Sequence, residues 1–300
     1  MKHNRIFTYS KSEIKESIIK MFEYGISKRR TSFYALRQNH FKDLDPPVFF
    51  LSTGRTGTKW FSELLKKDPY SLVFHAPKPD LSVQNTLAYK MLVMNDFQLK
   101  EEQKVLLKEI FLAGREQQLR YSFKTQKRYI ETNNYITFFA PLIAELMPHS
   151  IFVHLYRHPG KFVRSGLNRK YYLNEDPGKI RRIYPVKGFY YDHWSELTQI
   201  EKIAWLWNET NEFIEKFKGS ISQDRIINFN FEQLSDIEVE KMISQLNCRI
   251  RPGRIKKLLN IKVNRQKFSN DLRRFDDWNK SEKEMVLSHC RNLTQKYFNT

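Results

Sequence analysis

The chain is poor in the residues that mark secreted, metal-binding and membrane-spanning proteins. Cys248 and Cys290 are its only cysteines, which excludes a disulfide framework. No cluster of His and Cys has the spacing of metal ligands, and no run of 18 apolar residues is long enough to cross a membrane. The first residues, MKHNRIFTYSKSEIK, are too polar for a signal-peptide core. These absences predict a cytoplasmic protein without a metal site.

Acidic residues are also scarce relative to basic ones. The chain holds 52 Lys and Arg against 33 Asp and Glu, which gives a formal net charge of +19. Hydrophobic residues make up 40% of its 300 residues, enough for a packed core and too many for a disordered tail. The charge predicts an anionic partner: a nucleotide, a nucleic acid, an acidic glycan or a membrane surface. Charge alone does not choose among these.

The stretch from 45 to 67 predicts a strand, a tight polar turn and a helix. Val48–Leu51 is a short apolar run that suits a buried strand, and apolar residues recur at helical spacing from Trp60. The turn between them, STGRTGTK, places backbone N–H groups at a helix N-terminus, where Gly residues admit an anion closely. This arrangement predicts a phosphate-binding turn. It departs from the nucleotide-triphosphate loop GxxxxGK[ST], because the lysine comes one place late.

Strands and helices alternate along the rest of the chain. We expect further strands at 71–74, 128–131, 150–156 and 225–231, and helices at 96–120, 134–146, 195–217 and 280–297, with two more starting at 159 and 232. This alternation predicts an α/β fold of three layers, a P-loop-NTPase-like parallel sheet flanked by helices. We expect a basic helical leader at 1–44 and a single domain over 45–300.

Two segments allow alternative interpretations. The leader has one apolar face, which either packs on the domain or lies on anionic lipid as a peripheral membrane contact. Residues 171–194 are rich in Tyr, Lys and Arg without clear periodicity, which is typical of a lid, a binding loop or a poorly ordered segment.

Polar residues follow three of the predicted strands, where the edge of a parallel sheet usually binds ligands. His75 follows the strand at 71–74, and Glu131 ends the strand at 128–131. Arg157 follows the strand at 150–156, and Ser165 lies about two helical turns further on. His75 has the pKa class of a general base, but a histidine at a strand end is also a common structural element. Glu131 is a second candidate base, and such a residue more often pairs with an arginine.

Two of these segments resemble the motifs of sulfotransferases that use 3′-phosphoadenosine 5′-phosphosulfate (PAPS). STGRTGTKW resembles their 5′-phosphosulfate loop, and YRHPGKFVRSGL resembles their 3′-phosphate motif, in which an Arg at a strand end precedes a Ser by eight residues. RIINFNFEQL is similar to the late strand of the family, and KVNRQ followed by Trp278 to its cofactor-covering loop. Many cytosolic members of the family carry Lys where Arg55 stands, whereas tyrosylprotein sulfotransferases and some bacterial relatives resemble this chain and carry Arg there.

The resemblance implies PAPS as sulfuryl donor and adenosine 3′,5′-bisphosphate (PAP) as product. It implies catalytic roles for His75 and Arg55, with Glu131 as the reserve base, and it implies no metal. Expected cofactor contacts are Arg55, Thr56, Gly57, Thr58, Lys59, Trp60, Arg157, Ser165, Lys262 and Asn264.

The expected acceptor is a hydroxyl of a carbohydrate or glycolipid, because excess positive charge suits an anionic glycan. One alternative is a small-molecule kinase with a degenerate phosphate loop, although the strand at 150–156 ends in Arg and not in the Asp that a magnesium site needs. The other is a basic nucleic-acid-binding module. No helix-turn-helix, RNP or zinc pattern supports it, so nucleic acid is not the expected partner.

Overall fold

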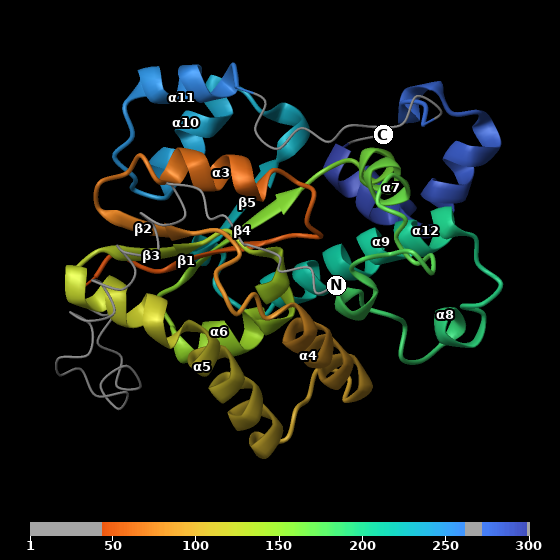
Figure 1. Ribbon diagram of the computed structural model, residues 1–300, viewed down its shortest axis with the longest axis horizontal. Helices are drawn as coiled ribbons and strands as arrows, with labels where there is room; N and C mark the ends of the chain where they lie inside the picture. The colour runs from red at the N-terminus through yellow and green to blue at the C-terminus, as the bar shows by residue number, and fades with distance from the viewer. Residues whose placement is uncertain (1–43, 262–271, 299–300) are drawn as a thin grey trace, which may run out of the picture.

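The computed structural model describes residues 44–261 and 272–298, and five strands in them form one parallel sheet (Figure 1). The strand order is β2–β3–β1–β4–β5. The strands are β1 Val48–Leu51, β2 Ser71–Phe74, β3 Arg128–Glu131, β4 Ile151–Tyr156 and β5 Ile226–Asn230. All four pairings between neighbours are parallel, which confirms the predicted sheet.

Helices cover both faces of the sheet, as its apolar central strand requires. Val48 and Phe50 of β1 join one buried cluster with helices α3, α10 and α11, whereas Phe49 and Leu51 join another with α4, α5, α6, α7, α9 and α12. This alternation follows from the two-residue period of a strand. The helices are α3 Thr58–Leu65, α4 Ser82–Met94, α5 Glu101–Thr125, α6 Ala140–Leu146, α7 Pro159–Leu167, α8 Phe189–Asp192, α9 Gln199–Lys218, α10 Asp236–Gln245, α11 Pro252–Leu259 and α12 Lys280–Phe298. The three predicted layers are therefore confirmed.

Some helix boundaries differ from the predicted ones. The helix expected at 96–120 begins at Glu101, where two acidic residues lie in its first turn, and continues to Thr125. Helix α4 was not predicted, because its buried positions include polar residues and give no clean apolar stripe. The helix expected at 134–146 is a 3₁₀ segment, Asn134–Phe139, followed by α6, and the side chain of Asn133 caps it by accepting from Tyr135 N–H at 3.0 Å.

The segment 171–194 is largely irregular, with a 3₁₀ turn at Lys179–Arg181 and the short α8. It packs on the core: Tyr172 meets Trp194 edge to face at 5.1 Å between ring centroids. No helix in the described ranges 44–261 and 272–298 has the length and apolarity needed to cross a membrane. The leader expected at 1–44 lies almost wholly outside the described residues.

Candidate active site

The segments that carry His75, Arg55 and Arg157 lie at one edge of the sheet, because every strand of it runs in the same direction. His75 follows β2, Thr132 follows β3, the turn from Ser52 follows β1, and Arg157 follows β4. Two strands separate β2 from β4, so the ends that carry His75 and Arg157 lie roughly 14 Å apart at the usual spacing of neighbouring strands. The central β1 turn therefore lies between the two.

The turn after β1 has a backbone that few residues can adopt. Gly54, Arg55 and Gly57 all have positive φ, at 76°, 59° and 93°. A Cβ on Gly57 would lie 2.1 Å from the ring of Phe231, so the position has no room for a side chain. The turn ends at the N-terminus of α3, whose first turn contains no acidic residue. Its unpaired N–H groups and the helix dipole therefore favour an anion there.

Thr56 in this turn supports the interpretation of an anion-binding site. Its side chain is fully buried, and within the described residues its Oγ1 has no hydrogen-bond partner. A buried hydroxyl without a partner is costly, so a bound acceptor such as a phosphate oxygen would stabilise it. The turn therefore fits the phosphate end of a nucleotide in shape and in chemistry.

The two sequence motifs come together in space although 110 positions separate them. Arg55 Nε donates to Ser165 Oγ at 3.2 Å, and Arg157 Nη1 donates to the backbone carbonyl of Arg55 at 3.3 Å. Burial lowers the pKa of Arg55, and the nearby cations Arg169 and Arg157 lower it further, whereas Tyr171 opposes the shift. These guanidinium groups repel one another, so an anion bound between them would stabilise the cluster.

Glu232 is a site residue that sequence reasoning missed. Its carboxylate accepts from Arg157 Nε at 3.2 Å and also pairs with Lys161. The side chain of Asn230 holds the following turn by accepting from Glu232 N–H at 2.9 Å. The Glu-x-Leu pattern after the last strand was the available signal, but it did not reveal the partners. Glu232 offsets part of the positive charge at this end of the site.

His75 is held in the tautomer that a general base needs. Its Nδ1 lies 2.8 Å from the carbonyl oxygen of Thr132. A carbonyl can only accept, so Nδ1 carries the proton and the lone pair of the neutral ring is on Nε2. Burial lowers the pKa of His75, and Lys59 and Lys66 lower it further, while the Thr132 hydrogen bond raises it. The ring therefore stays neutral at pH 7 and can accept a proton.

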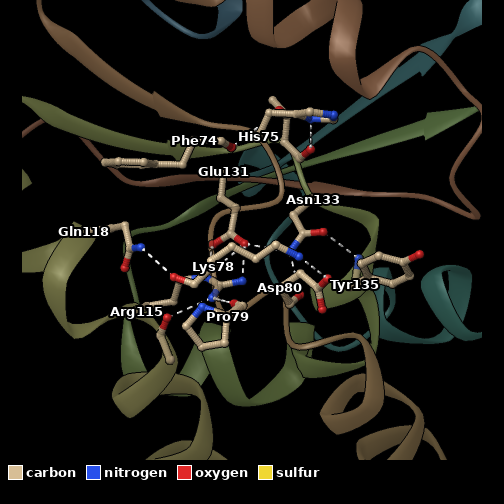
Figure 2. A network of polar contacts seen from close by, with 12 residues as sticks. Phe74, His75, Lys78, Pro79, Asp80, Arg115, Gln118, Glu131, Asn133 and Tyr135 are labelled. Carbon is tan, nitrogen blue, oxygen red and sulfur yellow. Dashed lines mark hydrogen bonds and ion pairs between the residues drawn. The ribbon is translucent and has the colours of Figure 1, made fainter. Parts of the chain in front are cut away.

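Glu131 is fully buried and its carboxylate is saturated with donors (Figure 2). Arg115 donates to Oε1 from Nη2 at 2.7 Å and to Oε2 from Nε at 2.8 Å. The Tyr129 hydroxyl and the Asn133 amide donate to it at 2.5 and 3.0 Å. The geometry thus favours the alternative in which Glu131 pairs with an arginine over the one in which it takes a proton.

Lys59, Trp60, Lys262 and Asn264 were also expected to contact the cofactor. Trp60 is 5% exposed, packs in the core, and donates from Nε1 to the carbonyl of Leu258 at 3.3 Å. Lys59 is exposed and acts electrostatically on His75. Lys262 and Asn264 lie outside the described residues. Across the described part of the chain, no group of three or more His, Cys, Asp or Glu gathers as metal ligands would.

The fold and this site define an α/β protein whose glycine-containing turn, a candidate anion site, lies at the carboxyl edge of its parallel sheet. Sulfotransferase STF9 of Mycobacterium avium aligns with 98% of this chain and 88% of its own, at 13% identity and a TM-score of 0.49. STF1 of Mycobacterium tuberculosis H37Rv aligns with 92% of this chain and 86% of its own, at 12% identity and a TM-score of 0.47.

The sulfotransferase domain from the curacin biosynthetic pathway aligns with 74% of this chain and 80% of its own, at 13% identity and a TM-score of 0.45. No protein-family model and no curated protein matches the chain. All three of these solved structures are named as sulfotransferases. The similarity is low, so we base the proposal below on the geometry of the site.

Proposed function

We propose that this protein is a sulfotransferase that moves the sulfuryl group of PAPS to a hydroxyl of a carbohydrate or glycolipid. The observation that carries the proposal is the contact of Arg55 with both Ser165 and Arg157. It joins a turn suited to a 5′-phosphate with an Arg–Ser pair suited to a 3′-phosphate. A nucleotide with a phosphate at each of these positions is the ligand that such a site would distinguish from ordinary nucleotides.

Binding of the nucleotide is assigned to the two motifs. The N–H groups that open α3, the Thr56 hydroxyl and the Arg55 guanidinium would hold the 5′-phosphate. Arg157 and Ser165 would hold the 3′-phosphate through a charge-assisted hydrogen bond and a hydroxyl. Arg55 borders both groups, so it would also offset the charge that develops on the leaving phosphate oxygen.

The acceptor hydroxyl must lose a proton, and His75 is the group we assign to this step. Its Nε2 carries the free lone pair because Nδ1–H is bound to Thr132. PAPS supplies the sulfuryl group when it is bound. By analogy with phosphoryl transfer, the protein contributes alignment and charge neutralisation.

The acceptor class is supported by surface chemistry. The chain has a net charge of +19, which favours an anionic glycan or a glycolipid headgroup. Phe189 and Tyr191 on the segment 171–194 are 65% and 59% exposed, and rings of this kind stack on sugars.

A thermal-shift panel tests the function against the two alternatives. PAP, ATP with Mg²⁺, and duplex DNA are added separately to the protein at two salt concentrations. We expect PAP without metal to raise the Tm and the other ligands to leave it nearly unchanged. A Tm shift with ATP and Mg²⁺ alone would favour the kinase, and one with DNA alone that vanishes in salt would favour the nucleic-acid module.

A further inference from the structure

Three consecutive backbone carbonyls of the loop after His75 each accept a hydrogen bond from a side chain (Figure 2). Gln118 donates to the carbonyl of Lys78 at 3.3 Å, Arg115 to that of Pro79 at 2.6 Å, and Asn133 to that of Asp80 at 3.2 Å. Loops on protein surfaces usually leave such groups to water. Here the loop is fixed to α5 and to the end of β3.

Two of these three donors, Arg115 and Asn133, are themselves held by one carboxylate. Glu131 binds Arg115 through two oxygens and accepts from Asn133 at 3.0 Å. The side chains of Arg115 and Glu131 are both 0% exposed. A buried ion pair stabilises a fold weakly, because desolvation of the two charges offsets most of their attraction. The pair does hold the Arg115 guanidinium, and Glu131 also holds the Asn133 amide, in positions from which both donate to the loop.

The same strand end also fixes the His75 ring. Thr132, whose carbonyl accepts from His75 Nδ1, lies between Glu131 and Asn133 in the chain. Ala76, the next residue after His75, has a φ of 45°, a conformation that alanine rarely adopts and that needs support from its surroundings. In Figure 2 the His75 ring points away from Arg115, so the network acts on it only through the backbone.

We propose that Arg115, Glu131 and Asn133 form a positioning network that holds the His75 loop and thereby the orientation and tautomer of the His75 ring. This inference rests on the proposed function, in which His75 is the base. It assigns Glu131 a role in place of proton transfer, and it gives Arg115 and Asn133 roles that their sequence context does not suggest. None of the three touches the reacting atoms.

The test compares two matched double variants, each of which removes an ion pair made by an arginine of α5. Arg115→Met with Glu131→Gln removes the buried pair without leaving one charge unpaired. Arg120→Met with Glu116→Gln makes the same changes in a pair that lies within α5, with Arg120 Nη2 2.6 Å from Glu116 Oε1. We measure PAP affinity, kcat with labelled PAPS, and the ¹⁵N spectrum of the His75 ring, assigned with His75→Gln.

We expect the wild type and the Arg120 variant to show the Nδ1–H tautomer of His75. The Arg115 variant should lose it, with kcat reduced roughly 10- to 100-fold and PAP affinity changed less than about twofold, as expected from a misplaced catalytic group. An unchanged tautomer with an unchanged kcat would overturn the proposal. Loss of kcat and PAP affinity in equal measure would also overturn it, because it would indicate general disruption.

Asn133→Ser keeps the test decisive if the Arg115 variant does not fold. Serine retains an oxygen that can cap Tyr135 N–H but loses the amide that binds Asp80 and Glu131. We expect a Tm near that of the wild type and a His75 ring that populates both the Nδ1–H and the Nε2–H tautomers. A ring that stays wholly in the Nδ1–H tautomer would contradict the proposed positioning role. The ring spectrum needs no substrate, so it separates the two proposals. If the wild type has no transferase activity but the variants still change the His75 tautomer, the proposed function is refuted and the positioning role stands.

Discussion

The two ends of the candidate site, the nucleotide end around Arg55 and the end around His75, are built on opposite principles. At the nucleotide end, Arg55 lies against Arg157 and Ser165, and the nearby cations lower its pKa in addition to burial. At the His75 end, the carbonyls of Pro79 and Asp80 and the Glu131 carboxylate all accept hydrogen bonds. At the first end the guanidinium groups lie near one another, and the buried Thr56 hydroxyl has no partner within the described residues, which suits binding of an anion. The second is saturated, which suits precise placement of one ring.

The difference predicts that the His75 end governs rate and the nucleotide end governs affinity. His75→Ala removes the proposed base and should produce the largest effect, a loss of kcat of about 1,000-fold. PAP affinity should remain within about twofold, because no nucleotide contact is assigned to His75. Calorimetric titration and single-turnover kinetics on the same sample check both values, and retained activity would move the base elsewhere.

Arg55 is the exception at the nucleotide end: it is assigned to the leaving phosphate oxygen, so its removal should affect turnover more than binding. We expect Arg55→Ala to lower kcat about 100-fold, because the charge on the leaving oxygen loses its partner. The PAP affinity should fall by less, since Arg157 and the backbone N–H groups remain. Steady-state kinetics measure the split, and a larger loss in affinity than in kcat would contradict this role.

Arg157→Ala should show the reverse pattern. Loss of the charge assigned to the 3′-phosphate should weaken PAP binding about 30-fold and leave the affinity for adenosine 5′-phosphate nearly unchanged. The ratio of the two dissociation constants is the decisive quantity. If both ligands weaken equally, Arg157 supports the fold of the site and does not read the 3′-phosphate.

The pH dependence of kcat sharpens the assignment of the base. A base works only in its neutral form, so activity falls as the pH drops through the pKa of His75. Burial places that pKa below the ordinary value of 6.5. At pH 6.5 we therefore expect more than half of the maximal rate. If the pH–rate curve instead has its inflection above pH 6.5, and the inflection disappears in His75→Gln, the pKa of His75 is raised and the account is contradicted.

Glu232 should have the smallest effect, and one of opposite sign. Its carboxylate lies against Arg157 and Lys161, so it competes with a bound phosphate for their charge. We expect Glu232→Gln to tighten PAP binding about threefold, in keeping with partly exposed ion pairs. Glu63→Gln, in a surface pair with Lys66, is the control. Weaker binding in Glu232→Gln would mean that the carboxylate mainly orients Arg157.

The strands could be predicted from the sequence, and the two motifs recognised in it, because both depend on local patterns. Val48–Leu51 is apolar throughout, and the turn at 52–59 combines two Gly with Arg and Lys between a strand and a helix, which is typical of a phosphate-binding turn. Arg115 and Glu232 could not be predicted in the same way. Arg115 is one of several basic residues on a long helix, and its partners lie on other elements. Glu232 gains its role only when β4 and β5 pair and bring it to Arg157.

The central claim is that one nucleotide carries a phosphate into each of the two motifs. Calorimetric titration of the wild type with PAP, adenosine 5′-phosphate and adenosine 3′-phosphate tests it directly, without need of an acceptor. We predict that PAP binds at least about 100-fold more tightly than either monophosphate, because both phosphates are held at once. Equal affinities for PAP and one of the monophosphates would show that only one motif binds phosphate, and would contradict the account.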